Sequence, residues 1–132
     1  MKCNLIFLGT VLGILLVSSC HPAEEGGEIP LPTSICLQAM HHDVPIPDVN
    51  IFFKYHCEEF PGYDRPEHYY DTMLVSDASG RVCIAPVPPG KHWAVAFGAS
   101  EHGIPLPIFG SLPMTIDLKR KPTIDTMLFM YE

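Results

Sequence analysis

Proline and glycine recur so often in this chain that they exclude an architecture built on long helices. The sequence holds 14 prolines and 10 glycines in 132 residues. Inside a helix, proline removes a backbone hydrogen-bond donor and its ring clashes with the preceding turn. The chain length fits one domain, and 47% hydrophobic residues are enough for a packed core. We therefore expect one domain built from short strands and turns.

Segments in which apolar and polar residues alternate follow one another from Thr33 onwards. Such alternation is typical of a strand with one buried face. Residues 49–55 show it most clearly, because their odd-numbered positions hold Val, Ile, Phe and Tyr. The number and spacing of these alternating segments predict an all-β fold, a seven-stranded antiparallel sandwich of the immunoglobulin-like or prealbumin-like kind. The seven expected strands are residues 34–41, 49–55, 70–76, 81–85, 91–98, 114–119 and 124–131.

Three short motifs occur in a characteristic order: residues 45–53 (PIPDVNIFF), 77–82 (DASGRV) and 87–95 (VPPGKHWAV). Together they resemble the prealbumin-like, carboxypeptidase-regulatory-like and collagen-binding B-type domains over about residues 35–131. That resemblance implies a structural or adhesion role. B-type domains often form a Lys–Asn isopeptide bond from their first strand, but residues 33–42 contain no lysine. The enzymatic transthyretin relatives end in a Tyr-Arg-Gly-Ser-type motif, which the ending Phe-Met-Tyr-Glu lacks.

The first 19 residues resemble the signal peptide of a bacterial lipoprotein. Lys2 precedes the apolar run Leu5–Val17, which is shorter than the roughly 20 residues that cross a bilayer. Residues 17–20 (VSSC) resemble a lipobox, which implies cleavage before Cys20 and acylation of this cysteine. Two or more acyl chains anchor a protein stably. We therefore expect localisation in the bacterial cell envelope, lipid-anchored at the outer membrane.

The chain then divides into a tether and a domain. Residues 20–32 mix Gly, Pro and Glu without an apolar period, so they predict a lipidated cysteine followed by a flexible acidic tether. An acidic patch after the acylated cysteine resembles the surface-export signal of some Gram-negative lineages, and a generic linker is the alternative. Residues 33–132 form the predicted β-sandwich domain.

Three cysteines remain beyond the signal peptide and the lipidated residue: Cys36, Cys57 and Cys83. One disulfide with one free thiol allows three pairings. Strand parity predicts that Val82 and Ile84 face inward and Cys83 faces the other side, and Cys57 lies just past a strand end, so a Cys57–Cys83 pair is conceivable. We favour the alternative of three reduced thiols that pack as small hydrophobes. A catalytic cysteine needs an activating partner that the spacing does not supply.

The segment 58–71 combines acidic and aromatic residues. Aromatic rings stack on sugars while carboxylates accept hydroxyl protons, so the segment is a candidate glycan or small-ligand site. A calcium site and a solvated loop whose aromatics lie back over the sandwich edge are the alternatives. The candidate contact residues here are Tyr63, Asp64, Glu67 and Tyr69.

The second irregular segment, residues 99–113, is apolar for a loop. If exposed, it marks an interaction surface at which Ile108 and Phe109 contact a partner. The alternative is a strand interrupted by proline that packs on the core.

Several function classes are disfavoured by composition and motifs. The net charge of −7 argues against nucleic acid as a partner, because phosphates demand a basic footprint. His41 and His42 are followed by Asp43, but adjacent strand residues point to opposite faces, so we expect an exposed turn and no metal. The chain lacks a phosphate loop and a nucleophile elbow. We predict a non-enzymatic interaction or adhesion module without cofactor, whose partner is an envelope protein or a glycan.

Overall fold

The structure of this protein is a computed structural model that describes residues 33–100, 105–117 and 123–132. The predicted signal peptide (1–19) and the predicted tether (20–32), with Cys20 as its expected lipidation site, lie outside the described residues. Within the described ranges the chain forms eight strands and one short 3-10 helix. The elements are β1 (Thr33–His41), β2 (Val44–Pro45), β3 (Asn50–Lys54), η1 (Glu67–Tyr69), β4 (Thr72–Val75), β5 (Arg81–Val87), β6 (Gly90–Ala99), β7 (Pro107–Ile116) and β8 (Thr123–Tyr131).

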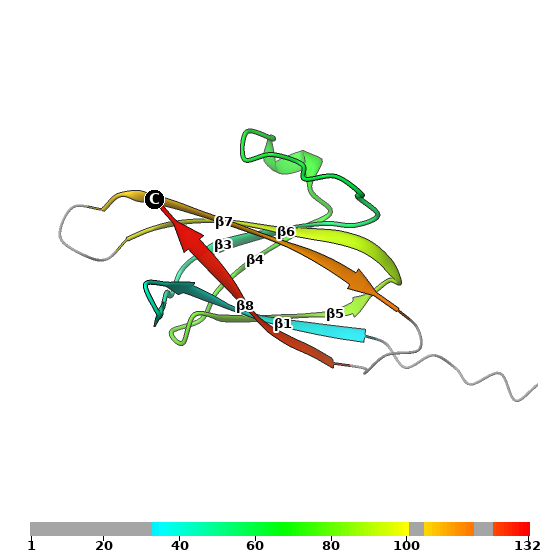
Figure 1. Ribbon diagram of the computed structural model, residues 1–132, viewed down its shortest axis with the longest axis horizontal. Helices are drawn as coiled ribbons and strands as arrows, with labels where there is room; N and C mark the ends of the chain where they lie inside the picture. The colour runs from blue at the N-terminus through cyan, green and yellow to red at the C-terminus, as the bar shows by residue number, and fades with distance from the viewer. Residues whose placement is uncertain (1–32, 101–104, 118–122) are drawn as a thin grey trace, which may run out of the picture.

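The strands form a sheet that curls into two facing layers (Figure 1). One layer holds β5, β1 and β8, and the short β2 extends it beside the end of β1. The other layer holds β4, β3, β6 and β7 in that order. β8 joins the two layers, because it pairs with β1 over most of its length and with β7 at its end. This arrangement confirms the predicted all-β sandwich.

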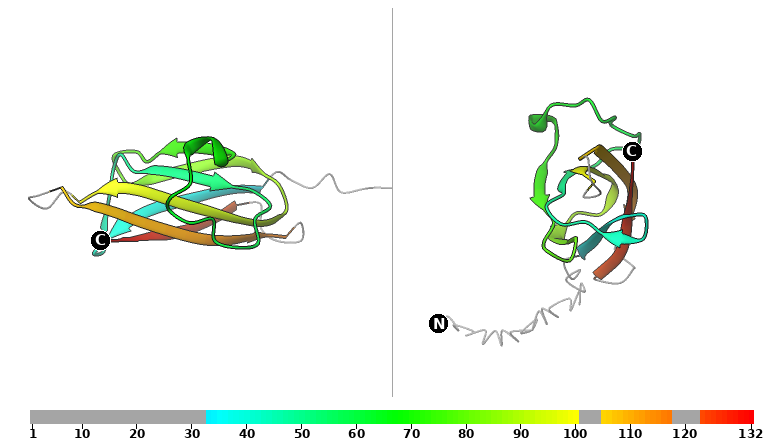
Figure 2. Two further views of the ribbon diagram at one scale, coloured as in Figure 1. Left: turned by 90° about the horizontal axis from the view of Figure 1, so that it is seen from above. Right: turned by 90° about the vertical axis from the view of Figure 1, so that its left-hand side faces the viewer.

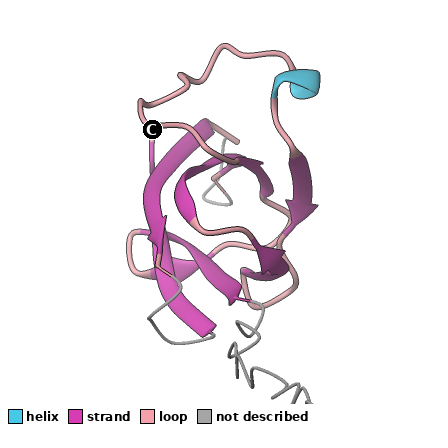
Figure 3. Cartoon of the chain, turned by 90° about the vertical axis from the view of Figure 1, so that its right-hand side faces the viewer, coloured by secondary structure: helices cyan, strands magenta, loops and turns pink. Residues whose placement is uncertain are grey.

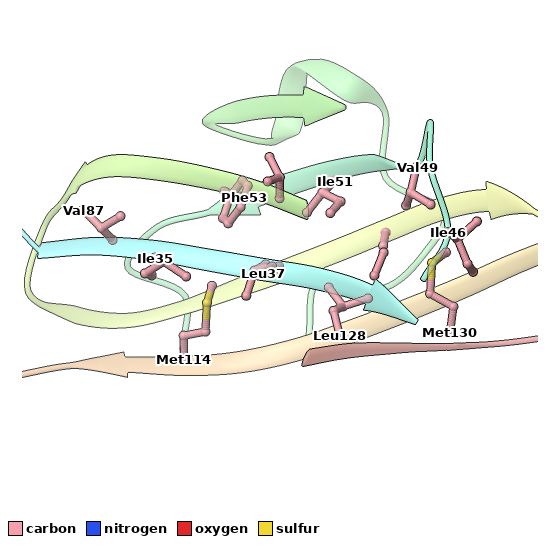
Figure 4. Close-up of a cluster of buried hydrophobic side chains, with 14 of the residues drawn as sticks. Ile35, Leu37, Ile46, Val49, Ile51, Phe53, Val87, Met114, Leu128 and Met130 are labelled. Carbon is pink, nitrogen blue, oxygen red and sulfur yellow. The ribbon is translucent and has the colours of Figure 1, made fainter. Parts of the chain in front are cut away.

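The hydrophobic core lies between the two layers (Figure 4). Ile35 and Leu37 in β1 and Ile51 and Phe53 in β3 are all 0% exposed. These are the positions that the alternation in the sequence assigns to the buried face. Burying each such side chain contributes about 1.5–3 kcal/mol, so this core is the main source of stability.

The segment that becomes β7 departs from the prediction. Residues 99–113 were expected to be irregular, but β7 begins at Pro107 and pairs with β6 along its whole length. Proline is tolerated at the first residue of a strand and on an edge. Pro107 is the first residue of β7, and Pro113 lies where β7 has no second partner among the described strands. The strand alternative is therefore the correct one for residues 107–116.

The expectation of a purely antiparallel sandwich is also wrong. β1 and β8 are parallel, in register from Ser34 opposite Thr123 to Met40 opposite Phe129. Parallel neighbours need a long crossover connection. Here nearly the whole domain provides it, because the first and last strands meet in one layer.

The oxidation state of the cysteines also differs from the favoured prediction of three reduced thiols. Cys36 and Cys83 form a disulfide, whereas Cys57 is a free thiol. The register explains this pairing, because β1 and β5 are antiparallel neighbours that place Cys36 directly opposite Cys83. The predicted strand parity for β5 is confirmed, with Val82 buried and Cys83 exposed. The bond therefore joins two strands on the outer side of their layer.

The motif Asp-Ala-Ser-Gly forms the tight turn between β4 and β5. The Asp77 carboxylate accepts hydrogen bonds from the backbone N–H groups of Ser79 and Arg81, both at 2.9 Å. Gly80 has a φ of 74°. A Cβ atom there would lie 2.9 Å from the carbonyl oxygen of Ala39, so only glycine fits. This turn fixes the point at which the chain passes from one layer to the other.

Candidate interaction surface

An aromatic cluster covers the outward side of the layer formed by β3, β6 and β7. Side chains that alternate with core residues along these strands point away from the core. The loop of residues 55–71 lies across this side and contributes further rings (Figure 2, left; Figure 3). We call the whole set the aromatic surface. Its members are Phe52, Phe60, Tyr63, Tyr69, Tyr70, Trp93, Phe97 and Phe109.

The two ends of the loop are joined by Asp71. Its carboxylate accepts a hydrogen bond of 2.7 Å from the backbone N–H of Tyr55 and forms an ion pair of 3.4 Å with Lys54. The backbone N–H of Asp71 donates to the carbonyl oxygen of Phe53 at 2.9 Å. These contacts close the loop at its base, so the loop returns to the strand next to the one it left.

The first residues of the loop are held by β6. The backbone N–H of Cys57 donates to the carbonyl oxygen of Lys91 at 3.0 Å, and the Lys91 ammonium pairs with Glu58. The buried His92 ring accepts from the N–H of His56 through Nδ1 at 3.1 Å. Its Nε2 lies 2.7 Å from the carbonyl oxygen of Pro88, which makes Nε2 the protonated nitrogen.

Burial determines the charge state of His92. The loss of solvent around the ring lowers its pKa, and His56 acts in the same direction. The ring is therefore neutral near pH 7, which leaves Nδ1 free to accept the loop hydrogen bond. A neutral histidine thus fixes the start of the loop on the sandwich.

Tyr63 and Phe60 form the outermost part of the aromatic surface. The Tyr63 hydroxyl donates to the Ser111 hydroxyl in β7 at 3.2 Å, and its ring centroid lies 5.5 Å from that of Phe109. The ring of Phe60 lies 5.2 Å from that of Trp93. Tyr63 and Phe60 nevertheless stay 41% and 42% exposed. Their rings are therefore held in place and accessible at once.

Tyr70 and Tyr69 form the inner part of the aromatic surface. Tyr70 is buried, its ring centroid lies 5.0 Å from that of Phe52, and burial raises its pKa. Tyr69 has two cationic neighbours: Lys54 Nζ at 4.8 Å and Arg65 Cζ at 5.3 Å from the ring centroid. Cation–π contacts of this kind contribute about 0.5–1 kcal/mol at exposed sites. They occupy the ring of Tyr69, which makes it a poorer platform for a ligand than Tyr63.

The structure brings together most of the predicted contact residues. Tyr63, Tyr69 and Phe109 belong to the aromatic surface, and Asp64 and Glu67 are exposed on the same loop. Ile108 is the exception, because it is 0% exposed and belongs to the core. Ile108 lies in the strand β7, in which alternate side chains point to opposite faces. Ile108 therefore points into the core and Phe109 points outward. The expectation that Ile108 contacts a partner is therefore wrong.

The histidine pair forms no metal site with its neighbours. The expected exposed turn holds for His42 and Asp43 but is wrong for His41, which is buried at the end of β1. The two imidazole centroids lie 4.0 Å apart. No group of three or more His, Cys, Asp or Glu side chains in the described ranges is placed to hold a metal ion.

Sequence reasoning missed Phe60, Trp93 and Phe97 as members of the surface. The alternation in β6 did place Trp93 and Phe97 on one face, in phase with Val95. Ordinarily the face with the larger apolar residues is the buried one. Here the core side of β6 carries Ala94 and other small residues, and the loop covers the larger ones.

Comparison with known proteins gives a similarity to solved structures. No family model matches the chain, and the search of curated proteins finds no match. BcpA, the major pilin subunit of Bacillus cereus, superposes with a TM-score of 0.52 at 13% identity. The fold is an immunoglobulin-like β-sandwich. The match covers 78% of this chain and 31% of the pilin, so the chain spans less than a third of its length. At this identity the likeness concerns the fold alone.

No helix in the described part of the chain has the length and apolar character needed to cross a membrane.

Proposed function

We propose that this chain is a non-enzymatic interaction module of the bacterial cell envelope, anchored at the outer membrane by lipid on Cys20. The observation that carries the proposal is the pair of partly exposed rings, Phe60 and Tyr63, held on the outside of the sandwich by a tied loop. Rigid aromatic side chains lose little conformational freedom on binding, which is why they dominate the energetics of interfaces. The use of the same fold in a pilin subunit supports a role at the cell surface.

Crosslinking in native cells followed by affinity purification tests the proposal. The double variant Phe60→Ser/Tyr63→Ser should lose the partner that copurifies with the unmodified protein, because it removes both exposed rings. Val44→Ser is the matched control, since Val44 is 50% exposed on β2 and lies outside the aromatic surface. Thermal unfolding of each variant verifies that the sandwich remains folded. Equal recovery of the partner with the double variant would exclude this surface.

The anchor has its own test. Cys20→Ala removes the thiol that the lipobox resemblance assigns to acylation, so the protein should leave the membrane fraction. Retention of this variant in the membrane would overturn the lipid anchor and leave the interaction surface untouched.

Glycan binding is the second candidate function. The exposed side of Tyr63 lies near Asp64, an exposed carboxylate for which the described residues provide no ion pair. An aromatic ring beside an acceptor suits the apolar face and hydroxyl groups of a sugar. Tyr63→Ala should weaken binding on a glycan array at least tenfold, whereas Tyr69→Ala should have less effect because cations occupy that ring. Equal binding by both variants and the unmodified protein would exclude this function.

A further inference from the structure

Most of β8 has one edge without a partner. On one side, residues 123–129 pair with β1. On the other side, β7 pairs with β8 only at Met130 and Tyr131, as far as the described strands go. In Figure 1 the first part of β8 is the outermost strand of its layer, and β7 diverges from it. Among the described strands, none pairs with the backbone N–H and C=O groups of residues 123–128 on this side, so this edge is available to another strand.

The other edges of the sheet are blunted, as is usual in soluble β proteins. β4 is four residues long, and β5 carries Pro86 within its seven residues. The open part of the β7 edge carries Pro113. Short length and proline both hinder pairing with a further strand. Residues 123–128 (TIDTML) have no proline, glycine or lysine, so this part of the β8 edge lacks those protections.

The side chains of this edge suit addition of a strand. Leu128 points into the core, whereas Met127 and Phe129 face outward and are 49% and 45% exposed. The carboxylate of Asp125 is held by Arg81 at 2.7 Å, so the one charge on the strand is paired within the chain. A strand added here would cover apolar side chains on the outer face and continue the layer β5–β1–β8.

We propose that β8 pairs with β8 of a second copy of this chain, antiparallel across a two-fold axis through Thr126. In a shared sheet, residues opposite each other must face the same side, so the two residue numbers must add to an even number. An axis at Asp125 would place two carboxylates opposite each other. An axis at Thr126 pairs residues 124–128 of the two copies, with Ile124 opposite Leu128 and Asp125 opposite Met127. The next residue, Phe129, already has its carbonyl oxygen beside Gly110 of β7.

A second copy is the occupant that the sequence of this edge favours. A two-fold interface is self-complementary, so one strand has to serve both sides. Residues 124–128 meet this requirement in the Thr126-centred register. Ile124 meets Leu128 on the inner face on both sides of the Thr126 pair, and no like charges meet on the outer face.

Cysteine crosslinking of the full lipidated chain tests the proposal. Directly opposite residues of antiparallel strands lie about 4.5–5.5 Å apart at Cα, which suits a disulfide. In a Cys57→Ser background, which removes the free thiol of the described residues, Thr126→Cys should form a covalent dimer on mild oxidation. Thr115→Cys, at an exposed position on β7, is the matched control. An equal dimer yield from both would show random collision and overturn the proposal, as would crosslinking of Thr126→Cys to another protein.

Two charge variants test the register. Met127 lies opposite Asp125 of the second copy, so Met127→Asp should lower the yield of the Thr126→Cys dimer at least tenfold through like-charge repulsion. Met127→Lys places an opposite charge at the same point and should preserve or raise the yield. Both substitutions replace methionine with a charged side chain, so loss of apolar surface alone would lower the dimer yield in both variants. An equal effect of both variants would overturn the Thr126-centred pairing.

Discussion

Removing the hydroxyl of Ser76 should destabilise the sandwich more than its small size suggests. Ser76 is 3% exposed, its hydroxyl donates to the Ile46 carbonyl oxygen at 3.0 Å, and it accepts from the Val49 N–H at 2.9 Å. Ser76→Ala leaves both backbone groups without these partners in a buried place. An orphaned buried group costs about 1–3 kcal/mol, so we expect a loss of about 2–4 kcal/mol in the free energy of unfolding. That is a large part of the roughly 5–15 kcal/mol typical of a domain.

Urea unfolding followed by intrinsic fluorescence measures this loss, and thermal unfolding should show a midpoint lower by about 10–20 °C. Ser79→Ala is the matched control in the same turn, because its exposed hydroxyl bonds to the Asp77 carboxylate. The control should lose less than about 1 kcal/mol, since water replaces an exposed hydrogen bond. A Ser76→Ala variant as stable as the control would refute the argument that this hydroxyl satisfies two buried groups.

Three further predictions concern packing, the disulfide and pH. Gly110→Ala should lower the free energy of unfolding in urea by about 1–3 kcal/mol, because its Cβ would lie 2.5 Å from Leu128 Cδ2. Cys36→Ala/Cys83→Ala should lower it by about 2–4 kcal/mol, because the bond spans 47 residues of sequence. Burial lowers the folded-state pKa of His92, so the unfolded chain binds this proton more readily. Stability should therefore fall as pH drops below about 6.5, and His92→Phe should flatten that part of a thermal-shift pH profile.

Local alternation was sufficient to predict the strands that have one face in the core. It identified β1, β3, β4, β5, β6 and β8, with the buried face correct in β3 and β5. It found only the end of β7, within the expected strand 114–119, because Pro107 and Pro113 suggest a break in the strand. Proline lacks a backbone N–H, and this matters only on the strand edge toward which that N–H would point. The opposite edge of β7 pairs with β6 along its whole length. Whether proline interrupts a strand therefore depends on which edge it faces, and that depends on the tertiary arrangement.

Long-range pairings were beyond what local patterns determine. The parallel contact between β1 and β8 joins residues at opposite ends of the domain. The disulfide depends on register in the same way, because Cys83 meets Cys36 only once β5 lies beside β1 with Gln38 opposite Arg81. A shift by one residue would turn one cysteine into the core. Sequence spacing alone therefore left the pairing open.

The candidate site could be predicted in composition but not in arrangement. The acidic and aromatic character of residues 58–71 singled out the loop that contributes rings to the aromatic surface, and Tyr63 and Phe109 do meet, with ring centroids 5.5 Å apart. What the sequence could not provide was the surface beneath the loop. The alternation in β6 indicates that the strand has two faces, but it does not show which of them the opposite layer covers. Trp93 lies on the outward face, beneath the loop.

The two outer sides of the sandwich meet solvent in different ways, and this difference separates the two proposed contacts. On the β3–β6–β7 layer, the loop covers the aromatic residues of the strands and leaves two rings exposed, so recognition there depends on side chains. On the β5–β1–β8 layer no described loop plays this part, and Met127 and Phe129 stay exposed beside an open backbone edge. Recognition there depends on backbone pairing. A variant that abolishes one contact should therefore leave the other intact: Phe60→Ser/Tyr63→Ser should still form the Thr126→Cys dimer, and Met127→Asp should still recover the envelope partner.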